Sequence, residues 1–198
     1  MVKHNRKNQA WALGVVYFVG AGACTDAAIV GFEEMEEDFC VPGATSTTFP
    51  DLPFRAGPLA TTTGTVPHQQ INPAIVPELI DDMSARIFAH DDVESRPSSI
   101  VSGATAIWLR DEVTLVRPEC VVLERELGHI HQDGSVHVTL PHNRIPGAVA
   151  ARWIERHPWA DTRAGFETYV MIFSPRDSGE VDVIVELISQ GISFVVGS

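Results

Sequence analysis

The stretch "RELGHIHQDGSVHV", residues 125–138, decides the fold that we predict and also carries three of the eight histidines of the chain. Apolar and polar residues alternate on both sides of an Asp-Gly pair, a pattern typical of two antiparallel strands joined by a tight turn. We therefore predict a β-hairpin over residues 126–140. Its histidines, His129, His131 and His137, are the first candidate functional residues.

The length of the hairpin loop determines which way these side chains point. A two-residue turn at 133–134 would send His137 to the face opposite His129 and His131. A three-residue loop over 132–134 would pair His129 with His137 and place all three histidines on one face. We favour the longer loop because it gathers the apolar residues of both strands on the other face. Those residues are Ile130, Val136 and Val138.

The remaining elements follow from hydrophobic spacing and from helix start and stop signals. Asp177 and Glu180 have the spacing of a capping box, and Gly191 is a stop signal for the helix that they open. We predict helices over 76–88, 146–156 and 178–191, strands over 104–109, 113–116, 120–123, 168–173 and 192–196, and a polar loop over 91–99.

A run of strands followed by alternating helices and strands indicates an α+β domain. We predict a single domain over residues 50–198, built from a mostly antiparallel sheet with helices packed on one face. An acidic, irregular leader over residues 33–49 precedes it.

The first 32 residues are predicted to be a signal peptide or a membrane anchor. Basic residues at positions 3, 6 and 7 precede an apolar run over 10–24, and small residues follow. This order is typical of secretory signals. We therefore expect the protein in the secretory pathway or associated with a membrane through residues 10–24. The alternative is that this segment is a buried first element of a cytoplasmic protein.

The charge and the cysteines limit the partners and the compartment. The formal net charge of −12 argues against nucleic acid, which needs clustered Lys and Arg, so a small-molecule substrate is the expected partner. The three cysteines form no CxxC pair, so the sequence does not indicate a zinc or redox motif. If the chain is exported, Cys40 and Cys120 are a candidate disulfide, and spacing alone leaves the pairing open.

Three interpretations of the hairpin histidines stay open: acid–base groups in a cofactor-free pocket, metal ligands, or polar residues on a half-exposed sheet face. We favour the first, because a neutral imidazole is a suitable base near pH 7. His-x-His pairs in metal sites of β-barrel oxygenases usually have a carboxylate a few residues later, whereas here Asp133 occupies the turn. We therefore expect no metal and no cofactor.

Five blocks of the chain resemble the fungal luciferases and their homologues. Three are "ELGHIHQDGSVHVTL" (126–140), "RWIERHPWA" (152–160) and "FSPRDSGEVDVIVELI" (173–188), and two lie upstream, "DLPFRAG" (51–57) and "TVPHQQ" (65–70). Their order and approximate spacing match as well. The resemblance covers roughly residues 50–198.

This resemblance implies an oxygenase that oxidises a 3-hydroxy-α-pyrone, or a related enol or polyketide, with molecular oxygen as co-substrate and no known metal or organic cofactor. It also implies an N-terminal membrane-associating segment. The chain departs from the pattern before residues 104–109, where Ser102 and Gly103 replace an expected Glu-x-His-like element, and at Ile154, where we expect glycine. These departures put light emission, rather than the fold, in question.

The implied chemistry assigns roles to the candidate residues. His129 or His131 takes the enol proton, His137 orients its partner, and Arg176 stabilises an enolate or peroxide anion. Glu126 is expected to be a salt-bridge partner. The candidates for substrate binding are Arg55, His68, Trp153 and His157.

Each of these residues has a structural alternative. Arg176 has Asp177 and Glu180 as ion-pair candidates, and Trp153 fits a hydrophobic core. Two other functions stay open beside the oxygenase: a non-catalytic small-molecule binder with the same pocket, and a metal-dependent enzyme that uses the histidine hairpin.

Overall fold

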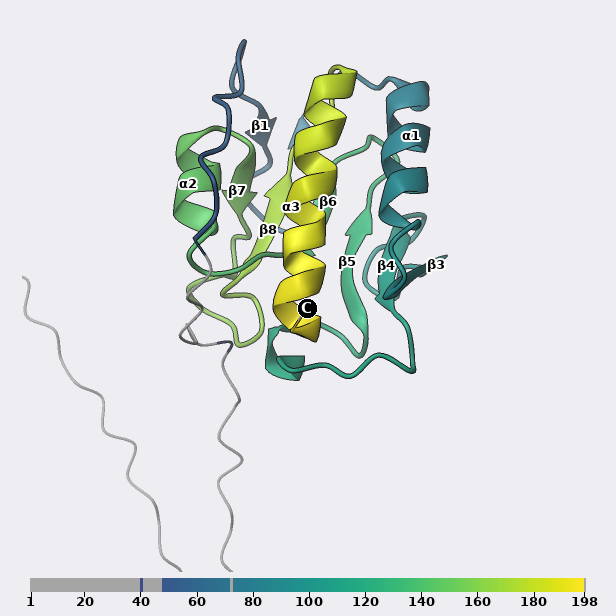
Figure 1. The fold of residues 1–198 in the computed structure, drawn as a ribbon. Coiled ribbons are helices and arrows are strands. Elements are labelled where there is room, and N and C mark those ends of the chain that lie inside the picture. Colours follow the sequence, from purple (N-terminus) through teal and green to yellow (C-terminus); the bar gives the residue numbers. More distant parts are fainter. Residues whose placement is uncertain (1–39, 41–47, 72, 198) are drawn as a thin grey trace, which may run out of the picture. The chain divides into compact units, whose positions relative to one another are not determined.

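The computed structural model describes residues 40, 48–71 and 73–197, and its centre is a six-stranded antiparallel sheet (Figure 1). The predicted α+β class is confirmed. In spatial order, the strands are β3 (Val93–Pro97), β4 (Thr105–Leu109), β5 (Glu126–Ile130), β6 (Val136–Thr139), β8 (Tyr169–Ile172) and β7 (Ile154–Arg156).

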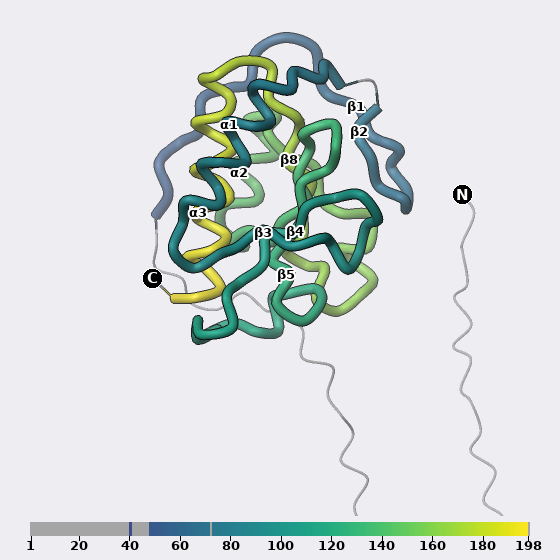
Figure 2. Tube along the Cα trace, turned by 90° about the vertical axis from the view of Figure 1, so that its right-hand side faces the viewer, coloured from purple at the N-terminus to yellow at the C-terminus, as the bar shows by residue number. Residues whose placement is uncertain are grey.

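The two faces of this sheet are covered differently. Helices α1 (Pro77–Ile87) and α3 (Ser178–Val196) lie side by side over one face, and the short α2 (Ile145–Ala150) packs beside β7. A small two-stranded sheet, β1 (Thr61–Thr62) and β2 (Gln70–Ile71), lies on the other side of the large sheet (Figure 2). We call the residues 61–71 the cover segment.

The central hairpin has the predicted register. His129 pairs with His137, the His131 amide donates to the carbonyl of Ser135, and Gly134 has a φ of 83°. The three-residue loop is therefore confirmed, since a left-handed conformation at this point suits glycine. Ile130, Val136 and Val138 are buried in the core beneath the helices.

The histidines belong to a row of residues that crosses the whole sheet on its other face. Consecutive strand pairings give this row as Arg96, Ala106, His129, His137, Met171 and Glu155. Because side chains alternate between faces along a strand, this face is separate from the apolar core.

An irregularity in β5 adds one further residue to this face. Ile107 pairs with Gly128 and Trp108 pairs with Glu126, so Leu127 is an extra residue on β5. In a regular strand, residues three apart point to opposite faces. The bulge shifts that alternation and brings Glu126 to the side of His129.

Several predicted boundaries were wrong in the first half of the domain. Residues 93–97 form the edge strand β3, which we predicted as a loop because the segment is mostly polar; only Val93 is fully buried there. Residues 113–116 and 120–123 are not strands. Val116 and Arg117 donate their amides to Val195 at the end of α3, and residues Pro118–Cys120 form a 3₁₀ turn.

The predicted helix 146–156 is in fact a helix followed by a strand. It ends at Ala150, Arg152 adopts a φ of 67°, and Ile154 then pairs with Ile172 as the start of β7. A left-handed residue cannot continue an α-helix, which explains the change of element.

The C-terminal helix begins as predicted but does not end at Gly191. The Asp177 carboxylate accepts a hydrogen bond from the Glu180 amide at 2.9 Å, which confirms the cap. Gly191 lies inside α3, and a Cβ there would be 2.2 Å from the Thr139 carbonyl oxygen. This glycine thus allows α3 to approach β6 closely, and the strand predicted over 192–196 is the last part of the helix.

The predicted segment over 1–32, with its membrane-associating run 10–24, lies outside the described residues, as does the leader apart from Cys40 and residues 48–49. Within the described part of the chain, no helix has the length and apolar character that crossing a membrane requires. Cys40 and Cys120, 80 residues apart, form a disulfide.

Candidate functional site

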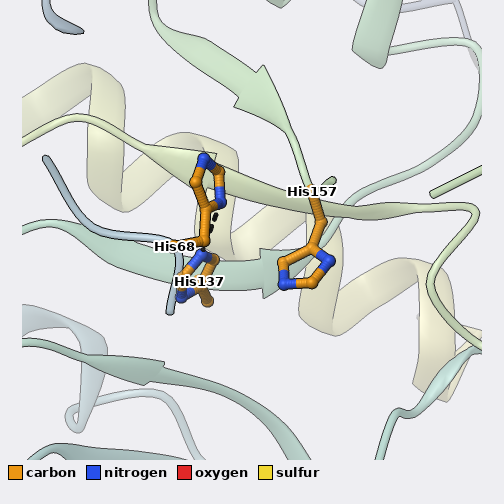
Figure 3. Close-up of side chains that lie close together, drawn as sticks. All are labelled: His68, His137 and His157. Carbon is orange, nitrogen blue, oxygen red and sulfur yellow. Dashed lines mark hydrogen bonds between the residues drawn. The ribbon is translucent and has the colours of Figure 1, made fainter. Parts of the chain in front are cut away.

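Five histidines from three separate segments of the chain, the hairpin, the cover segment and the end of β7, come together between the sheet and the cover segment. His129 lies on β5, His137 on β6, His131 in the hairpin loop, His68 just before β2 and His157 just after β7. We call these five residues the histidine cluster. Figure 3 shows three of them, with His68 against His137 and His157 beside them. The structure therefore brings together all three hairpin histidines and two of the residues predicted to bind substrate.

The ring nitrogens of the cluster lie at hydrogen-bonding distance from one another. His137 Nδ1 is 2.9 Å from His131 Nε2 and 3.2 Å from His129 Nε2. On the other side of the same ring, His137 Nε2 is 3.1 Å from His68 Nδ1. His137 is consequently the centre of the cluster, and it is 4% exposed.

A carboxylate lies at each end of this series of rings. Glu126 Oε1 is 3.0 Å from His129 Nδ1, and the same carboxylate accepts hydrogen bonds from Ser98 Oγ at 2.6 Å and the Ser99 amide at 2.8 Å. At the other end, Glu155 Oε1 is 3.6 Å from His68 Nε2. Glu126 is fully buried, whereas the Glu155 side chain is 40% exposed.

Burial makes the positive form of these rings unfavourable. It is the largest cause that lowers the pKa of His131 to about 4, and neighbouring His129 adds to the effect. Burial, followed by the charge of His68, lowers the pKa of His157 to about 4. Burial also lowers the pKa of His137, far below its usual range, and that of His68. These four rings are therefore neutral near pH 7.

Burial alone would raise the pKa of Glu126, but its hydrogen bonds outweigh burial. Donation from His129, Ser98 and Ser99 lowers the pKa of this carboxyl, which is consequently ionised at neutral pH. An ionised acceptor at this position requires a hydrogen on His129 Nδ1. Glu126, which we expected to be a salt-bridge partner, thus has His129 as its hydrogen-bond partner.

Aromatic side chains form the wall behind the cluster. The Tyr169 ring is stacked on His137 with 5.5 Å between ring centroids, and its hydroxyl lies 3.4 Å from His129 Nδ1. Phe166 packs against His157 at 4.8 Å. Burial raises the pKa of Tyr169 well above its usual value. Tyr169 and Glu155 were not predicted as site residues. Glu155 lies in the same cross-strand row as His137, and Tyr169 is two residues from Met171 of that row, so both belong to the face of the sheet that carries the histidines.

A cavity of about 250 Å³ opens beside the cluster at His131. It is lined by polar groups of the cover segment, of the hairpin loop and of the turn before β4, where the expected Glu-x-His-like element is absent. The lining residues are Gln69, Gln70, Val101, Ser102, Gly103, Ala104, His131, Gln132 and Asp133.

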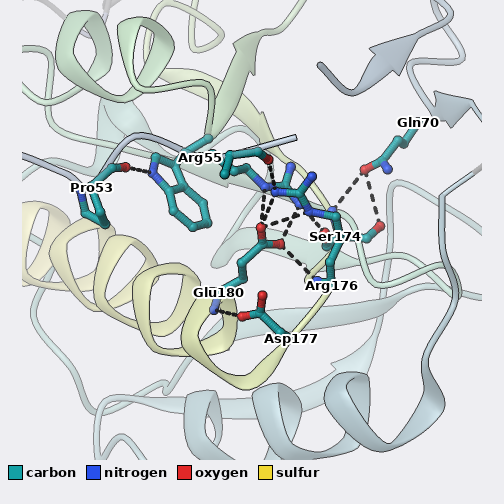
Figure 4. A network of polar contacts seen from close by, with 9 residues as sticks. Pro53, Arg55, Gln70, Ser174, Arg176, Asp177 and Glu180 are labelled. Carbon is teal, nitrogen blue, oxygen red and sulfur yellow. Dashed lines mark hydrogen bonds and ion pairs between the residues drawn. The ribbon is translucent and has the colours of Figure 1, made fainter. Parts of the chain in front are cut away.

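The two predicted arginines lie together in a second polar group, the arginine–glutamate network (Figure 4). Arg55 donates to both oxygens of Glu180, at 3.2 and 2.8 Å, and to the Ser174 carbonyl at 2.6 Å. Arg176 donates from Nε to Glu180 at 2.9 Å and from Nη2 to Glu180 and to the Ala56 carbonyl. These hydrogen bonds outweigh burial and lower the pKa of Glu180 to about 2.

Trp153 is part of the core beside this network. Its indole nitrogen donates to the Pro53 carbonyl at 2.7 Å, and the Arg55 guanidinium lies 5.4 Å from its ring. A second cavity, of about 340 Å³, is lined by Arg55, Arg176, Gln70 and Ser174 among others. The predicted site residues therefore fall into two groups, and Gln70 lines the cavities of both.

Comparison with known proteins finds similarity to luciferases. Residues 124–191 match the luciferase domain. This chain is similar to the luciferases of Armillaria gallica (28% identical over 164 residues), Armillaria ostoyae (30% over 164) and Armillaria mellea (28% over 166). Each similarity covers 74% of this chain and 62% of the relative, so the chain spans less than two thirds of the length of these relatives. No solved structure matches the chain.

The resemblance seen in the sequence is thus confirmed, and the residues that match the luciferase domain contain most of the cluster. Four of the five histidines, and the carboxylates Glu126 and Glu155 at the two ends of the cluster, lie within the matched residues. His68, on the cover segment, lies upstream of the matched residues.

Proposed function

We propose that this protein is a luciferase-like oxygenase that acts with molecular oxygen on a 3-hydroxy-α-pyrone or a related enol. One observation carries the proposal: the residues that match the luciferase domain supply four histidines of one buried cluster, beside a cavity at His131. Buried polar groups that converge at a cavity are typical of small-molecule sites.

The reaction follows from the chemistry of the substrate class. The enol hydroxyl loses its proton, and the electron-rich ring carbon then adds O₂ to give a peroxide. The terminal peroxide oxygen attacks the lactone carbonyl, and the ring opens with loss of carbon dioxide, leaving an acid in its excited or ground state. Oxygen is the oxidant and both of its atoms remain in the products, so the step needs no external reductant.

In this scheme, a histidine of the cluster is the base that takes the enol proton. His131 lines the cavity, so it is the member that meets the enol oxygen, and His129 and His137 adjoin it. The Tyr169 and Phe166 rings keep water away from the inner side of the cluster. Exclusion of water strengthens each electrostatic interaction with a developing charge.

The arginine–glutamate network is proposed to bind an anionic part of the substrate or product. Two guanidinium groups lie there beside the cavity of about 340 Å³, and their N–H groups, rather than a net positive charge, would recognise an anion, because Glu180 and Asp177 lie beside them. Arg176 is the more accessible, with its side chain 32% exposed. Arg55 is buried, and its hydrogen bonds to Glu180 and Ser174 hold the network in place.

The test is to mix the purified chain with a 3-hydroxy-α-pyrone of the hispidin type and to record photons and oxygen uptake together. His131→Gln should abolish uptake, whereas His90→Gln, a variant of a half-buried histidine in the turn after α1, should leave it unchanged. Uptake without light would keep the oxygenase and remove the luciferase. Binding of the pyrone without uptake would leave a non-catalytic binder and would overturn the proposal.

A further inference from the structure

We propose that His129, His131 and His137 bind one divalent ion of a first-row transition metal through His129 Nε2, His131 Nε2 and His137 Nδ1. The sequence predicted no metal because no carboxylate follows the His-x-His pair at the usual distance. The carboxylate is present instead as Glu126, behind His129, where it orients a ligand rather than acting as one.

The three nitrogens are arranged as metal ligands would be. His137 Nδ1 lies 2.9 and 3.2 Å from the other two atoms, and all three lie within 4.8 Å of one another. With metal–nitrogen bonds of 2.0–2.1 Å, two ligands at a tetrahedral ion lie about 3.3 Å apart. A small relaxation of the rings is therefore enough to admit the ion.

The contacts of the cluster leave one buried nitrogen unpaired. His68 Nε2 has no hydrogen-bond partner among the described residues, and it lies 3.6 Å from Glu155 Oε1. His68 Nδ1 lies against His137 Nε2, so His137 Nδ1 is the atom that lies near His129 Nε2 and His131 Nε2. These three ring nitrogens thus lie against one another with no carboxylate between them.

A metal ion bound by these three nitrogens would give each contact of the cluster a donor and an acceptor. Once His137 Nδ1 ligates the ion, His137 donates from Nε2 to His68 Nδ1, and His68 donates from Nε2 toward Glu155. This assignment gives a partner to His68 Nε2, a buried atom that otherwise has no hydrogen-bond partner among the described residues. It also gives both inner ligands the carboxylate-backed arrangement that is usual for metal-binding histidines.

A second possible triad, His68, His137 and His157, is less favourable. Its nitrogens are also within 4.8 Å of one another. However, His157 Nδ1 already accepts a hydrogen bond from the Trp159 amide at 3.2 Å, and His68 Nδ1 lies against His137 Nε2. The hairpin triad is preferred because it leaves those contacts intact and opens to the cavity at His131.

The donor set and the opening define the chemistry. Three imidazoles suit Zn, Co, Ni, Cu or Fe rather than Mg or Ca, and three protein ligands leave one position open. As an extension that rests on the proposed function, an enol oxygen bound at the open position would lose its proton more easily, as metal-bound water does. The ion would then promote loss of the enol proton, a role that the sequence analysis assigned to a histidine base.

The test measures metal binding without any substrate. The purified full-length chain is stripped with a chelator and dialysed against Co²⁺ or Zn²⁺, and bound metal is measured by elemental analysis and, for Co²⁺, by visible absorption. We expect one ion per chain. His131→Gln should weaken binding by at least on the order of 100-fold, and Glu126→Gln by about 10- to 100-fold because it removes the orienting carboxylate.

The matched control is His90→Gln, which should bind like the unchanged chain. Circular dichroism and thermal unfolding verify that each variant is folded, and His131 is chosen because it is only partly buried. If the folded chain binds no stoichiometric metal, or if the His131 and Glu126 variants bind as well as the control, the proposal is overturned. Oxygen uptake is measured in a separate assay, so its failure counts against the proposed function alone.

Discussion

The histidine cluster and the arginine–glutamate network are both buried and polar, yet they differ in how completely their groups are paired. In the network, the charged groups are ionised and each oxygen of Glu180 accepts hydrogen bonds from arginine or backbone donors. In the cluster, ring nitrogens lie against ring nitrogens, and His68 Nε2 has no hydrogen-bond partner among the described residues.

This difference separates a group that stabilises the fold from one that is prepared for chemistry. Removing one partner of a fully paired network leaves an uncompensated buried charge, which strongly destabilises the fold. We expect the incompletely paired cluster to contribute less to stability and to offer its ring nitrogens to a ligand. The predictions below test this contrast, beginning with the largest expected effect.

Glu180→Ala should give the largest loss of stability. It removes the acceptor of Arg55 and leaves a guanidinium buried without its carboxylate. Breaking a buried pair on one side costs about 3–5 kcal/mol. Thermal or urea unfolding measures this loss, and a loss below about 1 kcal/mol would show that the network is not the stabilising group.

Acid should weaken the same network in a defined range of pH. The pKa of Glu180 is about 2 in the folded chain, below its ordinary value of 4.5, so its stabilising contribution is complete above pH 4.5 and is lost as the pH falls toward 2. The full loss is about 3 kcal/mol. Unfolding free energies between pH 5 and pH 2 measure it, and Glu180→Gln should show a flatter profile. Equal profiles would contradict the assignment.

Gly191→Ala should destabilise the domain by about 1–3 kcal/mol, the usual cost of overpacking. The new Cβ would lie 2.2 Å from the Thr139 carbonyl oxygen, so α3 would have to move away from β6. Gly147→Ala in α2 is the matched control, because nothing lies within 4 Å of a Cβ there. That control should be neutral or stabilise by up to about 1 kcal/mol. Equal effects would rule out the close approach.

His131→Gln should have the smallest effect on stability and the largest on function. The side chain is partly buried and bonds to another uncharged ring, so we expect a change of less than about 1 kcal/mol, as is usual for such sites. Unfolding measurements paired with oxygen uptake and metal binding test this. A loss of several kcal/mol would mean that the cluster is a structural group like the network.

The hairpin could be predicted from the sequence because a period of two residues and a glycine in the loop determine its register. The features that could not be predicted depend on contacts between distant segments. Gly191 reads as a helix stop from the local sequence, but its role is to let α3 approach β6. The bulge at Leu127, which turns Glu126 toward His129, leaves no mark in the sequence pattern.

The candidate site was predicted in part for the same reason. The three hairpin histidines follow from local pairing, whereas the approach of His68 depends on how the cover segment lies over the sheet. Glu155 and His157 are two residues apart and share one face of the chain at β7. Because we predicted a helix over 146–156, we did not recognise this alternation, and Glu155 was not identified as the partner of His68.

The three-residue hairpin loop links the two faces of the protein to chain length at one point. One residue inserted or deleted between His131 and Ser135 would either change the loop length with the pairing of β5 and β6 kept, or shift β6 by one position against β5. In the shifted register, Val136 and Val138 would point toward the cavity side, and His137 toward the helices. Because both valines belong to the core, their burial favours the unshifted pairing, and the histidine face is protected when the loop changes length during evolution.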